Sequence, residues 1–179
     1  MLSEEKFIFD VITSVATALS VFVLACTLYL EYRWRRRKYA IDLLSAWNDC
    51  TADHAKAILS VFSGLRNGGA IDKDLGEKVF LCEKGHQYWD VRFHMVELLN
   101  HAEAIAVALD SRLAAKGILA KYVNQALCNW HNNLKGFIYA VNDIKGYRPW
   151  GRFEDYIESL RFRDTWSCHQ SKLNDNLSG

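Results

Sequence analysis

A stretch of twenty residues near the amino end contains no charged side chain. Residues 11–30 read VITSVATALSVFVLACTLYL. Twenty residues of helix rise about 30 Å, which matches the hydrocarbon core of a bilayer. The stretch is longer than the apolar part of a secretory signal, and the residues before it are not positively charged. The pattern therefore predicts a transmembrane helix rather than a buried core helix or a cleaved leader.

Small polar side chains recur at helical spacing along one side of this segment. This polar row consists of Asp10, Thr13, Thr17, Ser20 and Thr27. Lipid tails give helices no hydrophobic reason to associate, so small and polar faces are where helices meet one another or water. The row predicts self-association of the span, and a ring around an inward-facing row is the narrower hypothesis. The alternative is that the hydroxyls bond to carbonyls of their own helix and that Asp10 lies at the headgroup level.

A basic flank follows the apolar segment directly. It consists of Arg33, Arg35, Arg36, Arg37 and Lys38, whereas the other side of the segment offers only Lys6. An excess of Lys and Arg marks the cytoplasmic end of a span. We therefore expect a single-pass protein of the bacterial inner membrane with its amino terminus outside and the rest cytoplasmic. The flank is also expected to bind anionic lipid headgroups, which makes membrane lipid one partner.

The remaining sequence repeats apolar residues at helical spacing, and no window alternates as a strand does. The predicted fold class is all-α, with the transmembrane helix continuing into a cytoplasmic helical bundle. We expect an anchor over 1–38, a bundle over 39–165 and a tail over 166–179. We expect a first helix over about 5–47 that ends at Asn48 and Asp49, and a second helix that is capped by Thr51 and ends near Phe62. A short helix capped by Asp72 or Asp74 follows. An antiparallel pair of helices around 95–109 and 119–141 and a last helix over about 152–163 complete the bundle.

Composition narrows the classes of protein further. The 179 residues are 50% hydrophobic and carry a net charge of +1. Such a chain has too much apolar area to stay disordered and too little positive charge for a generally basic nucleic-acid binder. The five cysteines are scattered and odd in number, so in a cytoplasmic domain we expect reduced thiols.

The sequence contains no phosphate-binding glycine loop and none of the motifs GxSxG, HExxH and CxxC. The spacings of Cys82 with His86 and of Cys128 with His131 are loose for zinc, so no metal or other cofactor is expected. His94 and His101 are seven residues apart and share a helix face. That face is predicted to be an interface or solvent-exposed, and a metal or catalytic role is the lesser alternative.

Near the carboxyl end, Arg163 and His169 are separated by five residues. This pair resembles the R-x4–6-H motif of HEPN domains, which are small helical bundles that are often dimeric ribonucleases. The resemblance implies metal-independent RNA cleavage, with His169 as general acid or base and Arg163 stabilising phosphate charge. The alternatives are a vestigial or binding motif, and a surface tail without a site.

The order of segments along the chain resembles that of two groups of known proteins. The pattern is similar to a family of bacterial single-span proteins, through residues 34–38, the LLSAWND of 43–49, the helix over 98–109, and Trp150 with Phe153 and Glu154. The plan is also similar to the membrane accessory proteins of type VI-B CRISPR systems. That second resemblance implies a homo-oligomer, a membrane pore, a role in anti-phage defence and a protein partner in that system.

Three functions follow as hypotheses. We expect a non-enzymatic protein whose assembly in the membrane is its active event. The enzyme alternative is a membrane-tethered HEPN-like ribonuclease, and only this alternative requires RNA as a partner. The third is a scaffold that recruits a cytoplasmic partner to the membrane.

Overall fold

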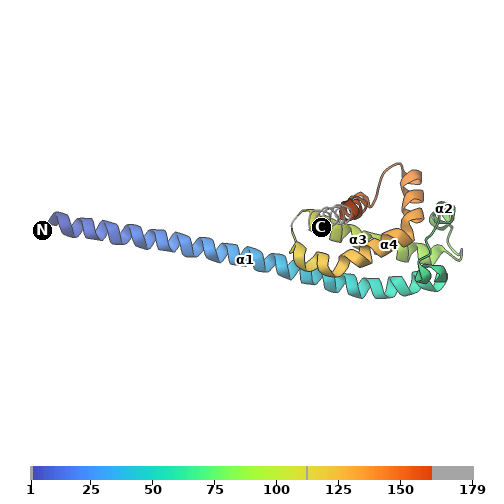
Figure 1. The fold of residues 1–179 in the computed structure, drawn as a ribbon, viewed down its shortest axis with the longest axis horizontal. Helices are drawn as coiled ribbons and strands as arrows, with labels where there is room; N and C mark the ends of the chain where they lie inside the picture. Colours follow the sequence, from blue (N-terminus) through green and yellow to red (C-terminus); the bar gives the residue numbers. More distant parts are fainter. Residues whose placement is uncertain (1, 112, 163–179) are drawn as a thin grey trace, which may run out of the picture.

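The longest element of the fold is the helix α1, Leu2–Val61, which contains 60 residues. In the computed structural model its first half projects as a free rod and its second half lies along a bundle of shorter helices (Figure 1). The structure describes residues 2–111 and 113–162, and all regular structure within these ranges is helical. The predicted all-α fold, with an apolar first helix that continues into a bundle, is therefore confirmed.

The predicted break in the first helix is wrong. Asn48 and Asp49 are exposed side chains within α1, and Thr51 lies inside the helix rather than capping a new one. Polar residues on the solvent side of a helix cost little as long as the opposite side stays in register with the core. That register is kept here by buried residues seven and eleven positions apart. They are Ala40, Trp47 and Ile58.

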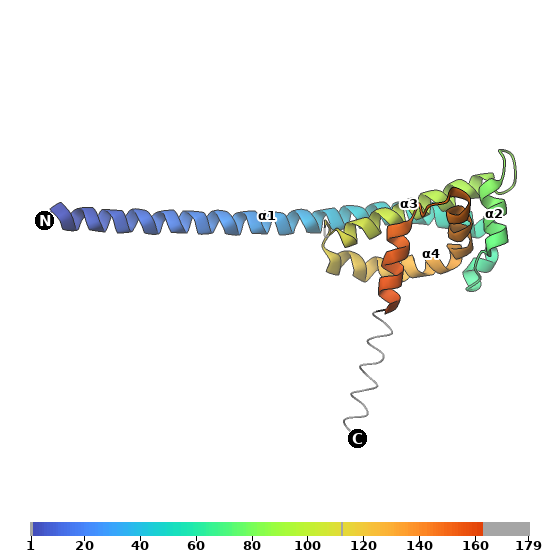
Figure 2. The same ribbon diagram turned by 90° about the horizontal axis from the view of Figure 1, so that it is seen from above.

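The bundle is built on α1 by two long helices. α3, Trp89–Asp110, runs back along the second half of α1, and α4, Lys116–Lys145, runs out again and packs against both (Figure 2). The apolar stripes that predicted this antiparallel pair are the buried faces of the two helices. Their core residues include Met95, Leu98, Leu99, Ala102, Ile105 and Leu109 on α3, and Leu119, Val123, Leu127, Leu134, Phe137, Ile138 and Val141 on α4.

The short helix α2, Lys73–Leu81, follows a single 3-10 turn, η1 (Ser63–Asn67), and packs mainly on α4. Asp72 caps α2, because its side chain accepts a hydrogen bond of 2.7 Å from the Leu75 N–H. The sequence left the cap open between Asp72 and Asp74, and the structure selects the first.

The contact between this segment and α4 is made by backbone. The N–H of Ile71 donates to the carbonyl of Asn133 at 2.9 Å, and the N–H of Gly136 donates to the carbonyl of Ile71 at 3.2 Å. Backbone groups of another segment thus enter the hydrogen-bond ladder of α4, which is a known cause of helix bending. The later part of α4 stands at a steep angle to its beginning (Figure 1).

A last helical segment, residues 151–162, closes the bundle. The carboxylate of Glu103 accepts hydrogen bonds from the backbone N–H groups of Arg152, at 3.2 Å, and Phe153, at 2.8 Å. The indole N–H of Trp150 donates to Asn100 at 3.0 Å. A carboxylate from α3 therefore caps this helix, and the predicted last helix is confirmed.

Replacing Gly136 with alanine should destabilise the bundle strongly. A Cβ at this position would lie 2.2 Å from the Ile71 carbonyl oxygen, a backbone atom that cannot move aside. We expect a loss of about 2–3 kcal/mol, the range of overpacking substitutions, in thermal unfolding of the full-length protein in detergent. Gly117→Ala is the matched control on the same helix, because nothing lies within 4 Å of its Cβ position. Equal stability of both variants would contradict the backbone contact.

Candidate functional site

The first half of α1 is an exposed apolar rod. Among the described residues it is the one helix long and apolar enough to cross a membrane, and its apolar part is not buried by the bundle. Phe22 and Leu30, for example, are exposed to 66% and 62%. Soluble proteins rarely expose continuous apolar surface of this extent. The rod therefore fits a membrane span.

The hydroxyls of the polar row bond within α1. Thr13, Thr17, Ser20 and Thr27 each donate to the carbonyl four residues earlier, at 2.8–2.9 Å. Hydroxyls satisfied in this way need no external partner in lipid and leave a strip of small side chains on the surface. The side chain of Asp10 lies outside the described part of the structure. Self-association through the row stays a prediction.

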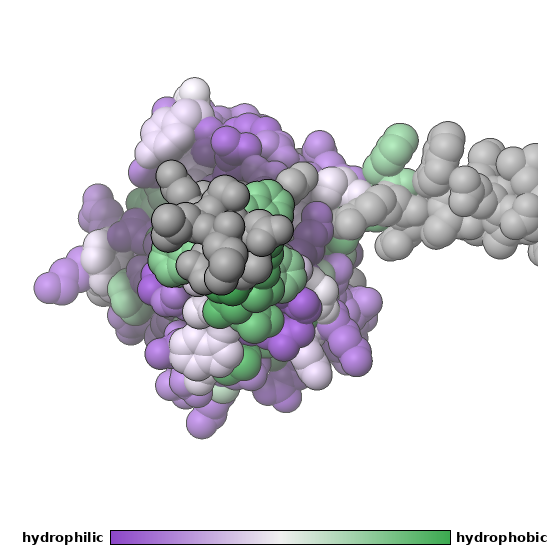
Figure 3. All heavy atoms as spheres, turned by 90° about the vertical axis from the view of Figure 1, so that its left-hand side faces the viewer, coloured by the Kyte–Doolittle hydropathy of each residue, from purple (hydrophilic) through white to green (hydrophobic). Residues whose placement is uncertain are grey.

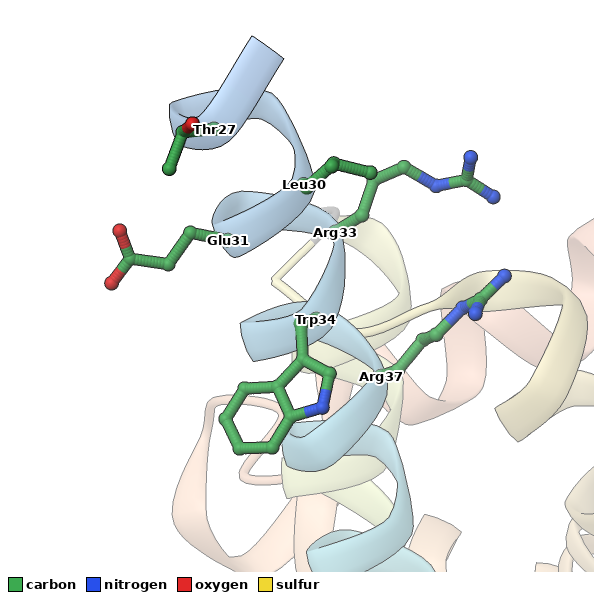
Figure 4. A pocket seen from close by; sticks show the side chains of 6 residues that line it. All are labelled: Thr27, Leu30, Glu31, Arg33, Trp34 and Arg37. Carbon is green, nitrogen blue, oxygen red and sulfur yellow. The ribbon is translucent and has the colours of Figure 1, made fainter. Parts of the chain in front are cut away.

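The basic flank is divided between two sides of α1. In Figure 4 the side chains of Thr27 and Glu31 point to one side of the helix, and those of Arg33 and Arg37 point to the other. These residues line a shallow hollow of about 580 Å³ together with Leu30 and Trp34. Arg35 forms an ion pair with Glu31 at 2.5 Å. The five basic residues therefore do not form one uniform surface.

Arg36 holds the bundle to the flank. Its guanidinium Nη2 donates to the carbonyl of Ala114 at 3.0 Å, and its own carbonyl accepts from the N–H of Ala115 at 3.2 Å. Arg36 was predicted as a ligand of lipid headgroups, which stays a prediction, and the structure adds these two contacts inside the protein. These two bonds fix the connection between α3 and α4 to α1 directly after the apolar rod.

A cluster of titratable groups lies in the seam between α1 and α3. The Nδ1 atoms of His54 and His94 are 2.7 Å apart, so one imidazole is protonated at Nδ1 and donates a hydrogen bond to the Nδ1 of the other. Burial lowers the pKa of His54, and the nearby His94 lowers it further. In the same seam, burial and the charge of Glu97 raise the pKa of the Cys50 thiol.

This seam refines the prediction for the histidines of α3. His94 faces α1, as expected of an interface. His54 is not among the predicted site residues, because the predicted break at Asn48 and Asp49 separates it from the buried side of the first helix. The signal that could have found it is its spacing of seven residues from Trp47, which places it on the same buried side.

His131 is buried at the contact of α4 with the last helix. The Nη2 of Arg161 lies 3.4 Å from its Nδ1 and donates to Asn132 at 2.5 Å. Burial, followed by the charges of Arg161 and Lys135, lowers the pKa of His131 to about 4. His131 is therefore a neutral core residue at pH 7. Within residues 2–111 and 113–162 no group of three or more His, Cys, Asp or Glu is placed to hold a metal ion.

The candidate ribonuclease pair cannot be placed on this fold. Arg163 and His169 lie outside the described residues, which end at Phe162. Their catalytic role stays a prediction from the sequence.

The fold and the exposed rod define a class of protein, namely an all-helical domain carried on a long apolar amino-terminal helix. The chain belongs to the DUF4760 family, a domain of unknown function, whose model matches residues 14–168. The match begins inside the apolar segment, so rod and bundle form one family unit. No curated protein and no solved structure matches the chain. The family match links the chain neither to HEPN ribonucleases nor to CRISPR accessory proteins.

Stability should fall as the pH drops, because His131 must be neutral in the folded state. The pKa of His131 is about 4 in the fold against 6.5 for an ordinary histidine, so the unfolded chain binds its proton more readily. The stability is fully present above pH 6.5 and is lost as the pH falls through 4. We expect a loss on the order of 2 kcal/mol between pH 7 and pH 5 from this residue.

The measurement is the pH dependence of thermal unfolding of the full-length protein in detergent. His131→Gln stays neutral at every pH and should flatten this dependence. His86→Gln changes an exposed histidine and is the control. An unchanged slope in His131→Gln would refute the assignment.

Proposed function

We propose that the protein is a single-pass inner-membrane protein, with its amino terminus outside and its bundle cytoplasmic, that self-assembles through the polar row of α1. An uncharged apolar rod that the bundle leaves exposed supports the span. The position of the basic flank after the rod supports the orientation. The row of small side chains on the rod supports the assembly.

The observation that carries the proposal is the rotational position of the row. Thr27 and Arg36 are nine positions apart, which is about two and a half turns at 3.6 residues per turn. The two residues therefore lie on opposite sides of α1. Arg36 holds the bundle, so the row faces away from it. Glu31 and Arg33 show the same division (Figure 4).

This arrangement suits a symmetric assembly. A second copy can approach the row without meeting the bundle of the first copy. Several copies joined in this way have their rows at the centre and their bundles at the periphery. A pore lined by the row is the narrower form of the proposal.

The biological setting of the proposal is anti-phage defence, and it rests on the resemblance of plan to the CRISPR accessory proteins. A protein partner in such a system would meet the outward-facing bundles. The ribonuclease alternative depends on Arg163 and His169, so no contact of the described residues adds to it.

Enlarging two side chains of the row should weaken assembly. We expect Thr17→Leu with Ser20→Leu to raise the dissociation constant of the oligomer about tenfold, because contacts between helices in membranes contribute about 0.6–2 kcal/mol each. Insertion should be unaffected, since leucine increases the hydrophobicity of the span. The measurement is the mass of the full-length protein in mild detergent across a dilution series.

Ala18→Leu with Ala25→Leu is the matched control. It adds more bulk than the row variant does, to the same helix but on the side away from the row. A monomeric wild-type protein, or equal weakening by both pairs of substitutions, would contradict assembly through the row. Loss of membrane potential on expression that the row variant abolishes and the control retains would support the pore.

A further inference from the structure

A small cavity opens between α1 and the beginning of α4. Its volume is about 250 Å³. A water molecule occupies about 30 Å³ in the liquid, so the cavity has room for a group of the size of a phosphate. The residues that line it come from the basic flank and from the first turn of α4. They are Arg33, Arg36, Arg37, Ala115, Lys116, Gly117 and Ile118.

The lining of this cavity is cationic and lacks a counter-ion. It contains three guanidinium groups and one ammonium group and no acidic side chain. No ion pair of the described residues engages Arg33, Arg37 or Lys116, whereas Arg35 on the far side of α1 is paired with Glu31. Such a concentration of positive charge around a concave surface favours an anion.

Two further features of the backbone and of Arg36 add to this preference. α4 is 30 residues long, and in the described structure its first turn has neither a side-chain cap nor an acidic residue. The N–H groups at the start of a long helix attract negative charge. The Nε of Arg36 is buried and has no hydrogen-bond partner among the described residues. An anion in the cavity would supply acceptors for these donors.

We propose that this cavity is a binding site for a phosphate group, supplied by the headgroup of an anionic phospholipid. The lipid source rests on the proposed span of α1. Arg33 is three residues beyond Leu30, or about 4.5 Å along the helix, so the cavity then lies at the headgroup level. Seen along α1, the bundle surface around the helix is mostly hydrophilic, as expected of a surface that meets headgroups (Figure 3).

The site differs from a general attraction of the basic flank to the membrane. A diffuse attraction would involve all five flank residues equally and would ignore α4. The cavity is instead lined by Arg33 and Arg37, and neither Arg35 nor Lys38 is part of its lining. It also adds Lys116, which is far from the flank in sequence. Lys116 is therefore the residue that tests the proposal most directly.

The test is a titration of full-length protein in neutral detergent with phosphatidylglycerol, followed by native mass spectrometry. Lys116→Gln should weaken binding of this lipid about fivefold or more, which corresponds to one lost phosphate contact. Lys121→Gln removes the same charge from an exposed site on the same helix and should weaken binding less than about twofold. On α1, Arg33→Gln should have the larger effect and Lys38→Gln the smaller.

The ligand controls distinguish the source of the phosphate. Competition by inorganic phosphate or glycerol phosphate that depends on Lys116 would support a phosphate site filled from solution. Binding of phosphatidylglycerol without such competition would support the lipid headgroup. Equal weakening by Lys116→Gln and Lys121→Gln, or equal binding of zwitterionic phosphatidylcholine, would overturn the proposal.

The oligomer mass is measured on the same samples. Lys116-dependent binding to a monomeric protein would leave the phosphate site standing and refute assembly. A stable oligomer without Lys116-dependent binding would support assembly and refute the phosphate site.

Discussion

The uninterrupted backbone of α1 is the constraint on which the rest of the structure depends. The backbone N–H of each helical residue donates a hydrogen bond to the carbonyl four positions earlier, so a helix without a break has no hinge. One end of this rod presents apolar side chains to its surroundings, and the other end supplies Ala40, Trp47 and Ile58 to the core of the bundle. The same helix is thus both an exposed apolar rod and a wall of the domain. The family match over residues 14–168 covers both parts.

The rotation of α1 about its own axis then decides what each residue of the basic flank can do. Arg36 lies on the side of the bundle and is used to hold the α3–α4 connection. Arg33 and Arg37 lie next to it and remain at the surface of a cavity. Arg35 lies on the other side and is neutralised by Glu31. Residues that are equivalent in a count of charges are therefore distinct in the fold.

The sequence was sufficient for the elements whose signal is local. The apolar rod, the stripes of α3 and α4 and the last helix all follow from side chains within one helix or one turn, whereas the choice of Asp72 over Asp74 as the cap of α2 needed the structure. α1 was ended too early because Asn48 and Asp49 look like a break, and only the packing of Trp47 against distant residues shows otherwise.

The contacts that were missed join segments far apart in the chain. The backbone of Ile71 enters α4 at Gly136, and an isolated glycine in a helical pattern is the only local trace of such an approach. The His54–His94 pair joins two helices, and the spacing within each helix gives the side on which a histidine lies but not which residue of the other helix it meets. The candidate ribonuclease pair, Arg163 and His169, stays as the sequence left it.

The hydrogen bonds of Arg36 to the α3–α4 connection also fix where along α1 the bundle begins. If the rod spans the bilayer, the near end of the bundle sits directly on the membrane surface, with no tether on which to swing. The far end, where α1 stops at Val61, lies 25 residues further along the helix, or about 38 Å away. In that case a molecule bound at the end near η1 would be held away from the lipid by this length of α1, and one bound at the start of α4 would lie next to the headgroups.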